Sequence, residues 1–294
     1  MSQKIRKLSW LEIWQLTKTS FVEFFKGDSF THGAALAYYA IFALIPILYL
    51  TITSIGAFLG QDRVVEVVSF FMESKMGVGD VSVFTDLMYE WGVGASGTVL
   101  LKVIGIVVLI FTSTAMFNSL RNSLNSFFGI KPIRHYNVVL DSLLSRLVSF
   151  ALLALFAVII IVIYFAQSVL LSLTSDWLAT GSFGEKTFLL VFEHFTMVLV
   201  NFILFAFIFK YLHDGKIKWK LALGGSLFTS ILLYIGQLLV NYYLSNFFFA
   251  ANSGIAGTLL AILTWIFYTS QIIFLGAKFT AVYARKVGKP IIPK

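Results

Sequence analysis

Residues 147–166 read LVSFALLALFAVIIIVIYFA, a run of twenty residues that holds no charged side chain. A helix needs about 20 apolar residues to cross the ~30 Å hydrocarbon core of a bilayer. A strand of a membrane barrel would alternate apolar and polar residues, whereas this run is apolar on every side. The sequence therefore predicts a membrane-spanning α-helix.

Similar apolar runs recur along the whole 294-residue chain, which is 59% hydrophobic and only 12% charged. So few charges could not cover the surface of a soluble protein. We expect an all-α integral membrane protein with a single membrane domain, residues 1–294, built as a bundle of six transmembrane helices. The predicted spans are 33–59, 97–120, 143–172, 187–212, 217–247 and 254–284.

The charges orient this bundle. Assigning the segments between spans alternately to two sides puts most of the 22 Lys and Arg residues, and both chain ends, on one side. The positive-inside rule makes that side cytoplasmic. The net charge of +8 then reflects topology and contact with anionic headgroups at the cytoplasmic face, and nucleic acid is not an expected partner.

Two segments lie outside the predicted spans. Residues 1–26 lack the compact apolar core of a cleavable signal, and their aromatic residues recur at near-helical spacing, which predicts an amphipathic helix in the cytoplasmic interface. A solvated helix packed on the bundle is the alternative. Residues 60–96 fit a short external helical hairpin, divided at Gly77 and Gly79, that caps the outer mouth of the bundle.

Several spans retain polar side chains at helical spacing, and each must face protein or water because it is costly in lipid. They either tie helices to one another or converge on a hydrated cavity. The candidate cavity residues are Asp28, His32, Tyr39, Asn118, Arg121, Asn122, Asn125, Gln237, Asn241, Gln271 and Lys278.

Three charged candidates, Asp28, Arg121 and Lys278, fall near the cytoplasmic ends of their spans. Together they predict a positive vestibule that opens inward and suits an anionic or zwitterionic substrate. Arg121 would donate two hydrogen bonds, and Lys278 would act as a point charge. The alternative is that Arg121 and Lys278 snorkel to headgroups and that Asp28 caps a helix.

Pro46 interrupts the first predicted span and bends it, either as a gating hinge or as a fixed kink. Small residues repeat every four positions from Gly276 and Thr280 onward, which is typical of a close packing seam. Such a seam could join two helices of one chain or two copies in a homo-oligomer.

Three motifs identify a family resemblance: AALAYYAIFALIP at 34–46, FNSLRNSLNSFFGIKP at 117–132 and SGIAGTLLAILTWIFYTSQIIFLGAKFTAVYAR at 253–285. They resemble the YihY/BrkB family of bacterial inner-membrane proteins, formerly mislabelled ribonuclease BN. The resemblance implies a multi-pass six-helix bundle with both termini inside and a role in envelope transport, for which lipids have been proposed as cargo.

The chain departs from the family pattern at two places. Lys278 stands where many members have the acid of a Gly-Ala-Glu motif, which weakens any claim that this position is a fixed catalytic or coupling acid. The proline that often follows the fourth span is missing after Tyr211, and Asp214-Gly215 is expected to make the turn instead.

Catalytic chemistry is not expected. A ribonuclease needs clustered carboxylates that hold metals or a histidine pair, and the four histidines show no motif spacing. The chain has no phosphate-cradling glycine loop, and its lack of cysteine removes thiolate metal sites. We expect no enzyme activity, no cofactor and no metal.

The residues and the resemblance together favour a transporter or flippase of an anionic or amphiphilic, lipid-like cell-envelope component, working through a polar cavity open to the cytoplasm. The alternative is a non-catalytic membrane scaffold or assembly partner in envelope biogenesis. Ribonuclease activity is the least favoured function. Expected partners are membrane lipids and a lipid or anionic small-molecule substrate.

Overall fold

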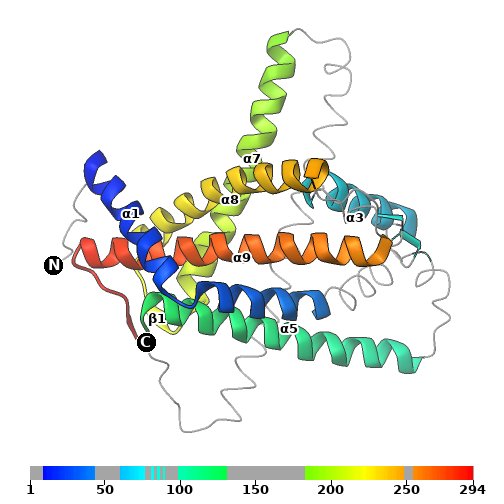
Figure 1. The fold of residues 1–294 in the computed structure, drawn as a ribbon, viewed down its shortest axis with the longest axis horizontal. Coiled ribbons are helices and arrows are strands. Elements are labelled where there is room, and N and C mark those ends of the chain that lie inside the picture. Colours follow the sequence, from blue (N-terminus) through cyan, green and yellow to red (C-terminus); the bar gives the residue numbers. More distant parts are fainter. Residues whose placement is uncertain are drawn as a thin grey trace. The chain divides into compact units, whose positions relative to one another are not determined.

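The computed structural model describes residues 9–43, 60–76, 99–130, 183–247 and 254–293, together with residues 81, 82, 85, 86 and 89 (Figure 1). The predicted span 143–172 and the part of the first span that contains Pro46 lie outside the described residues. The described elements are α1 (Trp10–Lys26), α3 (Gln61–Met76), α5 (Val99–Phe128), α7 (Phe183–Tyr211), β1 (Gly215–Lys216), α8 (Trp219–Phe247), α9 (Gly254–Lys286) and β2 (Ile292–Pro293). Residues 29–43 are also helical.

The prediction of a mainly helical membrane protein is confirmed. Within the described residues, three helical segments are long and apolar enough to cross a bilayer: His194–Tyr211, Trp219–Val240 and Leu259–Lys286. The count of six spans and the cytoplasmic position of both termini stay predictions.

Two helices end in the same glycine-dependent cap. After α5, Gly129 has a φ of 70°, its N–H donates to Ser126 O, and the N–H of Ile130 donates to Asn125 O at 2.8 Å. After α9, Gly288 has a φ of 65° and makes the equivalent pair of bonds. This is the Schellman arrangement, which satisfies the last helical carbonyls and turns the chain sharply. The cap places the end of α5 eight residues past the predicted run 97–120, because the last turns of the helix are polar.

The chain divides into two compact units. Unit 1 comprises Met1–Thr17, Asn125–Tyr234 and Gly276–Lys294, and unit 2 comprises Lys18–Leu124 and Ile235–Leu275. Helices α1, α5, α8 and α9 each contribute residues to both units.

Helix α1 begins with a capping box. The Ser9 N–H donates to Glu12 Oε2 at 2.8 Å, and the Glu12 N–H donates to Ser9 Oγ at 3.3 Å. Leu16 is buried, whereas Trp10 and Trp14 are 87% and 69% exposed. The helix therefore packs one face against the protein and leaves an aromatic face uncovered, as an interfacial helix would.

Unit 1 is held by an apolar cluster and an exchange of small residues between α8 and α9. The rings of Phe228 and Phe279 stack with centroids 4.1 Å apart beside Leu16 of α1. A β-carbon on Gly225 would overlap the Thr280 hydroxyl, and a β-carbon on Gly276 would overlap the Thr229 hydroxyl. Each helix therefore contributes one glycine and one threonine, and each glycine faces the threonine of the other helix. Each hydroxyl also donates to the carbonyl four residues earlier on its own helix. The seam predicted at Gly276 and Thr280 thus joins α9 to α8 of the same chain.

A short antiparallel sheet completes unit 1. β1 pairs with β2 so that Gly215 lies opposite Pro293 and Lys216 opposite Ile292. Two residues are too few to show an alternating pattern, so these strands could not be predicted from the sequence.

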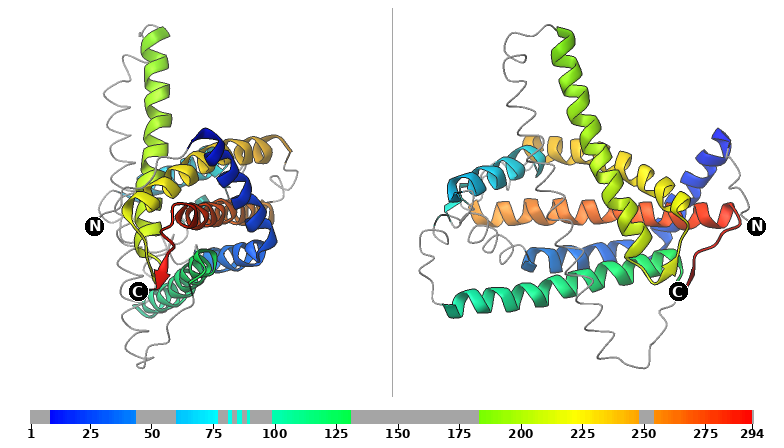
Figure 2. Two further views of the ribbon diagram at one scale, coloured as in Figure 1. Left: turned by 90° about the vertical axis from the view of Figure 1, so that its left-hand side faces the viewer. Right: turned by 180° about the vertical axis from the view of Figure 1, so that it is seen from behind.

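In unit 2, helix α3 shares one hydrophobic core with parts of α8 and α9. Met72 of α3, Val240 of α8, and Ala261 and Ile262 of α9 are buried together. Figure 2 shows α3 beside the last turns of α8 and the first turns of α9. The first half of the predicted external hairpin is therefore a helix that packs against these two helices.

Candidate functional site

The predicted cavity residues are shared between the two units. Asn125 and Lys278 belong to unit 1, and the remaining candidates belong to unit 2. The side chain of Asn241 lies outside the described part of α8. The candidates are therefore described as two groups, one in each unit.

The first group contains a histidine whose tautomer follows from its neighbours. His32 Nδ1 lies 3.0 Å from Ser123 Oγ on α5, and Ser123 Oγ donates to Ser119 O at 2.7 Å. A hydroxyl has a single proton to give, so Nδ1–H of His32 is the donor to Ser123. Ser123 is fully buried and His32 partly so. The bond ties the helical segment 29–43 to α5.

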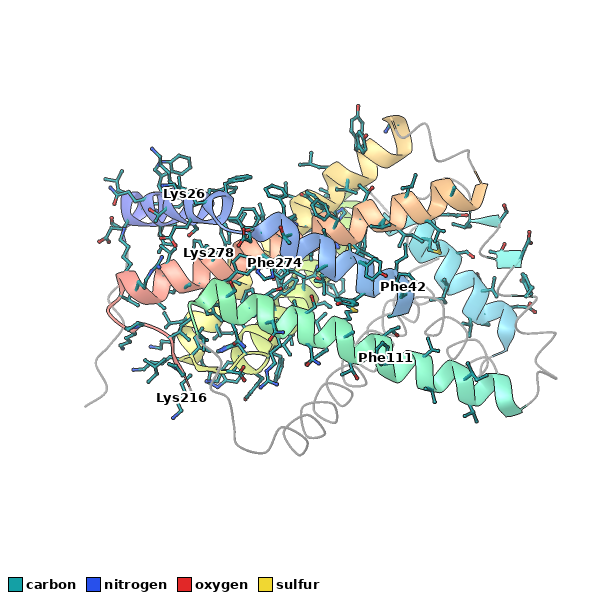
Figure 3. All side chains as sticks on the ribbon, turned by 60° about the horizontal axis from the view of Figure 1, so that its bottom comes forward. Lys26, Phe42, Phe111, Lys216, Phe274 and Lys278 are labelled. Carbon is teal, nitrogen blue, oxygen red and sulfur yellow. The ribbon has the colours of Figure 1, made fainter. Side chains whose placement is uncertain are left out.

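Gly33 lets α9 approach the same segment. A β-carbon at Gly33 would overlap the side-chain amide of Gln271 and lie 2.9 Å from Ser270 Oγ. One turn further along α9, the Phe274 ring meets the His32 ring edge-on with centroids 6.3 Å apart. Figure 3 labels Phe274 where α9 runs beside the segment 29–43. A side chain at position 33 would therefore force the Gln271 amide to move.

The amide of Gln271 is buried and unsatisfied. Both Nε2 and Oε1 are shielded from solvent, and neither has a hydrogen-bond partner among the described residues. Leaving a buried donor or acceptor without a partner costs about 1–3 kcal/mol. Such a group normally marks a site that water or a bound molecule completes. Among the predicted cavity residues, Gln271 is therefore the one whose unsatisfied amide is a candidate for hydrogen bonding to a ligand or to water.

The other candidate side chains of unit 2 are more exposed to solvent. Asp28, Asn118 and Asn122 are exposed. Tyr39, Arg121 and Gln237 are partly exposed. Arg121 lies two residues before the buried Ser123 on α5, a spacing that puts the two side chains on different sides of the helix.

The second group, in unit 1, is a set of packing contacts. Asn125 Nδ2 donates to Asp214 Oδ2 at 2.7 Å, and Asp214 N–H donates to Asn125 Oδ1 at 2.9 Å. Lys278 Nζ lies 5.6 Å from the centroid of the Phe127 ring, a cation–π contact between α9 and the end of α5. Both contacts connect separate parts of the chain.

His213 also belongs to this group, although it was not among the predicted cavity residues. It is buried, its Nδ1 accepts from the Gly215 N–H at 2.9 Å, and its Nε2 lies 2.8 Å from Phe209 O. Because Nδ1 is an acceptor, Nε2–H donates to Phe209. The predicted turn at Asp214-Gly215 is thus braced by the ring of His213 and leads into β1.

Ser123 and His213 were not among the predicted residues, and Asp214 was predicted only as part of a turn. The one available signal was the pair Ser119 and Ser123, whose spacing of four residues puts both serines on one face of α5. Within the part of the chain that the structure describes, no three His, Asp or Glu side chains come together as metal ligands would.

Comparison with known proteins supports the assignment of this chain as a membrane protein. Residues 20–292 match the family model described as virulence factor BrkB. The chain is similar to the UPF0761 membrane protein of Teredinibacter turnerae (strain ATCC 39867 / T7901), with 23% identity over 281 residues, which are 92% of this chain and 60% of the relative. It is 23% identical over 181 residues to the UPF0761 membrane protein of Glaesserella parasuis serovar 5 (strain SH0165), 61% of either chain.

A third relative, the UPF0761 membrane protein RC1_0578 of Rhodospirillum centenum (strain ATCC 51521 / SW), is 22% identical over 259 residues, 88% of this chain and 55% of its own length. The chain therefore spans between 55% and 61% of the length of these curated relatives. No solved structure matches it.

Proposed function

We propose that this chain, which belongs to the virulence factor BrkB family of membrane proteins, moves an anionic or amphiphilic, lipid-like envelope component through a polar cavity open to the cytoplasm. We place it, as a multi-pass protein, in the bacterial inner membrane. The observation that carries the proposal is the buried Gln271 amide, which has no partner among the described residues.

Polar groups from three helices support a hydrated cavity in unit 2. His32 comes from the segment 29–43, Ser123 from α5 and Gln271 from α9. Helix tying accounts for the bond between His32 and Ser123. It does not account for Gln271, because an amide that only joined helices would have its donor and acceptor satisfied by protein. Water, or a substrate that offers both a donor and an acceptor, would complete it.

Charge gives the substrate class. Arg121 lies on the same face of α5 as the asparagine Asn118 and its partly exposed side chain is a fork that matches a carboxylate or phosphate. An amphiphile with an anionic headgroup could bring its charge to Arg121 and its hydroxyl or amide to Gln271. The apolar remainder would stay in the bilayer.

Retention of ligand by the extracted protein tests this proposal. Native mass spectrometry of protein extracted from its own membrane should show a tightly held lipid or glycolipid that is lost in Gln271→Leu and in Arg121→Ala. Thr264→Val is the control, since Thr264 is a polar, exposed residue seven positions earlier on α9. A ligand that persists in both variants would contradict the cavity.

Transport of a lipid across the bilayer is tested by a separate measurement. Proteoliposomes that carry a headgroup-labelled anionic lipid should expose the inner-leaflet label to a membrane-impermeant quencher faster when the protein is present. Gln271→Leu should return the rate to that of empty vesicles while folding normally. If the wild type moves neither anionic nor zwitterionic lipid, and the variants are active in a cell-based assay, the scaffold alternative replaces transport.

No enzyme activity is part of this proposal. The scaffold alternative loses one of its arguments, because the seam at Gly276 that could have paired two copies is occupied by Thr229 of the same chain.

A further inference from the structure

One end of unit 1 gathers lysines from two distant parts of the chain. Lys216, Lys218 and Lys220 come from the connection between α7 and α8, and Lys289 comes from the segment after α9. The glycine cap at Gly288 turns the chain after α9, and the pairing of β1 with β2 holds the two segments together. Figure 3 shows Lys216 projecting away from the ribbon.

The positive charges are close enough to influence one another. The pKa of Lys289 is lowered, first by partial loss of solvent, then by the charge of Lys218 and a side-chain hydrogen bond with it, and then by the charge of Lys220. Ammonium groups held this close repel one another. The protein tolerates that repulsion at a site where an anion would remove it.

The start of α8 adds to the positive potential. The carbonyl of Lys218 accepts from the N–H groups of Leu221 and Ala222, which makes Lys218 the N-cap residue. Lys220 lies in the first turn, and this turn holds no acidic residue. The N-terminus of a helix carries a partial positive charge, so lysines are the opposite of what helix stability favours there.

Aromatic neighbours place this cluster at a membrane surface. The apolar segments of α7 and α8 end at Tyr211 and begin at Trp219, and both side chains are exposed. Their rings meet edge-on at 5.8 Å, and Lys210 Nζ lies 5.6 Å from the Trp219 ring centroid. Tryptophan and tyrosine at the ends of spans mark the headgroup region of a bilayer.

We propose that Lys216, Lys218, Lys220 and Lys289 form a binding site for the phosphate of an anionic phospholipid headgroup. The lysines supply donors and charge, and Trp219 lies at the level of the glycerol backbone. This site depends on the chain being a membrane protein and not on the transport proposed above. It would exist in a scaffold as well.

A lipid-binding titration with matched variants tests the site. The full chain in detergent is titrated with phosphatidylglycerol, phosphatidylcholine or inorganic phosphate and followed by native mass spectrometry. We compare the wild type with Lys218→Gln/Lys220→Gln and with Lys289→Gln. Lys18→Gln/Lys26→Gln is the control, because these lysines of α1 are exposed and their loss removes the same charge as the double variant.

The wild type should bind phosphatidylglycerol in preference to phosphatidylcholine. Its affinity should fall about tenfold in the double variant and less in Lys289→Gln, while the control should keep it. Equal losses in the double variant and the control would overturn the site in favour of a general attraction to charge. Inorganic phosphate that displaces phosphatidylglycerol at equal concentration would overturn the assignment to a lipid.

A second measurement covers the case in which the double variant fails to fold. Phosphatidylglycerol bound to the wild type should slow acetylation of Lys289 and leave that of Lys18 unchanged. Equal acetylation of Lys289 with and without the lipid would contradict the proposal.

Discussion

Asn125 and Asp214 hold each other through two hydrogen bonds, although 89 positions separate them in the sequence. The asparagine amide donates to the aspartate carboxylate and accepts from the aspartate backbone. Both ends of the amide are therefore used. The pair fastens the last turn of α5 to the turn that follows α7, inside unit 1.

Replacing this asparagine with an acid should loosen unit 1. In Asn125→Asp two carboxylates would face each other, and the donor to Asp214 Oδ2 would be lost. We expect a loss of about 1–3 kcal/mol of stability, measured by thermal unfolding in detergent. Asn122→Asp makes the same change at an exposed position three residues earlier and should have little effect. Similar losses in both variants would mean that the pair contributes no specific stability.

The contact between Gly33 and Gln271 predicts a rescue. Gly33→Ala should destabilise the protein by about 1–3 kcal/mol, because the new methyl group overlaps the Gln271 amide. Gly33→Ala/Gln271→Ala should recover part of that loss, since truncating the glutamine makes room. A double-mutant cycle of unfolding measurements gives the coupling between the two sites. Additive effects would show that the side chains do not compete for space.

Gln271 should also separate stability from binding. Gln271→Leu removes an unsatisfied buried amide of similar size, so the variant should unfold no earlier than the wild type. The same variant should lose the retained ligand. A marked fall in melting temperature would show that protein groups satisfy this amide in solution.

Exchange of a glycine in the α8–α9 seam should be costly. Gly225→Ala places a methyl group where the Thr280 hydroxyl lies, and the expected loss is about 1–3 kcal/mol. Gly27→Ala is the control, because a β-carbon at Gly27 would have only ordinary contacts, the nearest at 3.6 Å. Equal melting temperatures for the two variants would argue against a tight seam.

Lys289 should respond to pH and to amine reagents. Partial loss of solvent, and then repulsion from Lys218 and Lys220, hold the pKa of Lys289 below the usual 10.5, so the folded protein is destabilised while Lys289 is protonated. That destabilisation is relieved as pH rises through the lowered pKa toward 10.5. At mildly alkaline pH, Lys289 should therefore acetylate faster than Lys18, as measured by peptide mass spectrometry. Lys218→Gln should slow the reaction, because the charge of Lys218 lowers the pKa of Lys289 more than the charge of Lys220 does.

The helices were predictable and their partners were not. Long apolar runs predicted α7, α8 and α9 closely, since hydrophobicity over about 20 residues is a local property. The apolar criterion cut α5 short, because its last turns carry Asn122 and Asn125 and it ends only at the Gly129 cap. The sequence marked Gly276 as part of a seam but could not say what lies opposite.

The same limit applies to the candidate site. Helical spacing singled out His32, Asn125 and Gln271 together, and the structure gives them three different surroundings. His32 bonds to Ser123, Asn125 bonds to Asp214, and Gln271 has no partner among the described residues. Spacing identifies the polar face of a helix, whereas the partner of each side chain depends on contacts made far away in the chain.

The facing glycines and threonines of α8 and α9 fix the register in which the two helices pack. Sliding α9 by one turn in one direction would set Thr229 against Thr280, and sliding it in the other would set Gly225 against Gly276 and open a void. Neither neighbouring position fits, so this stretch has one stable setting along its length. Any conformational change of the protein would have to move these parts of the two helices together as one rigid body.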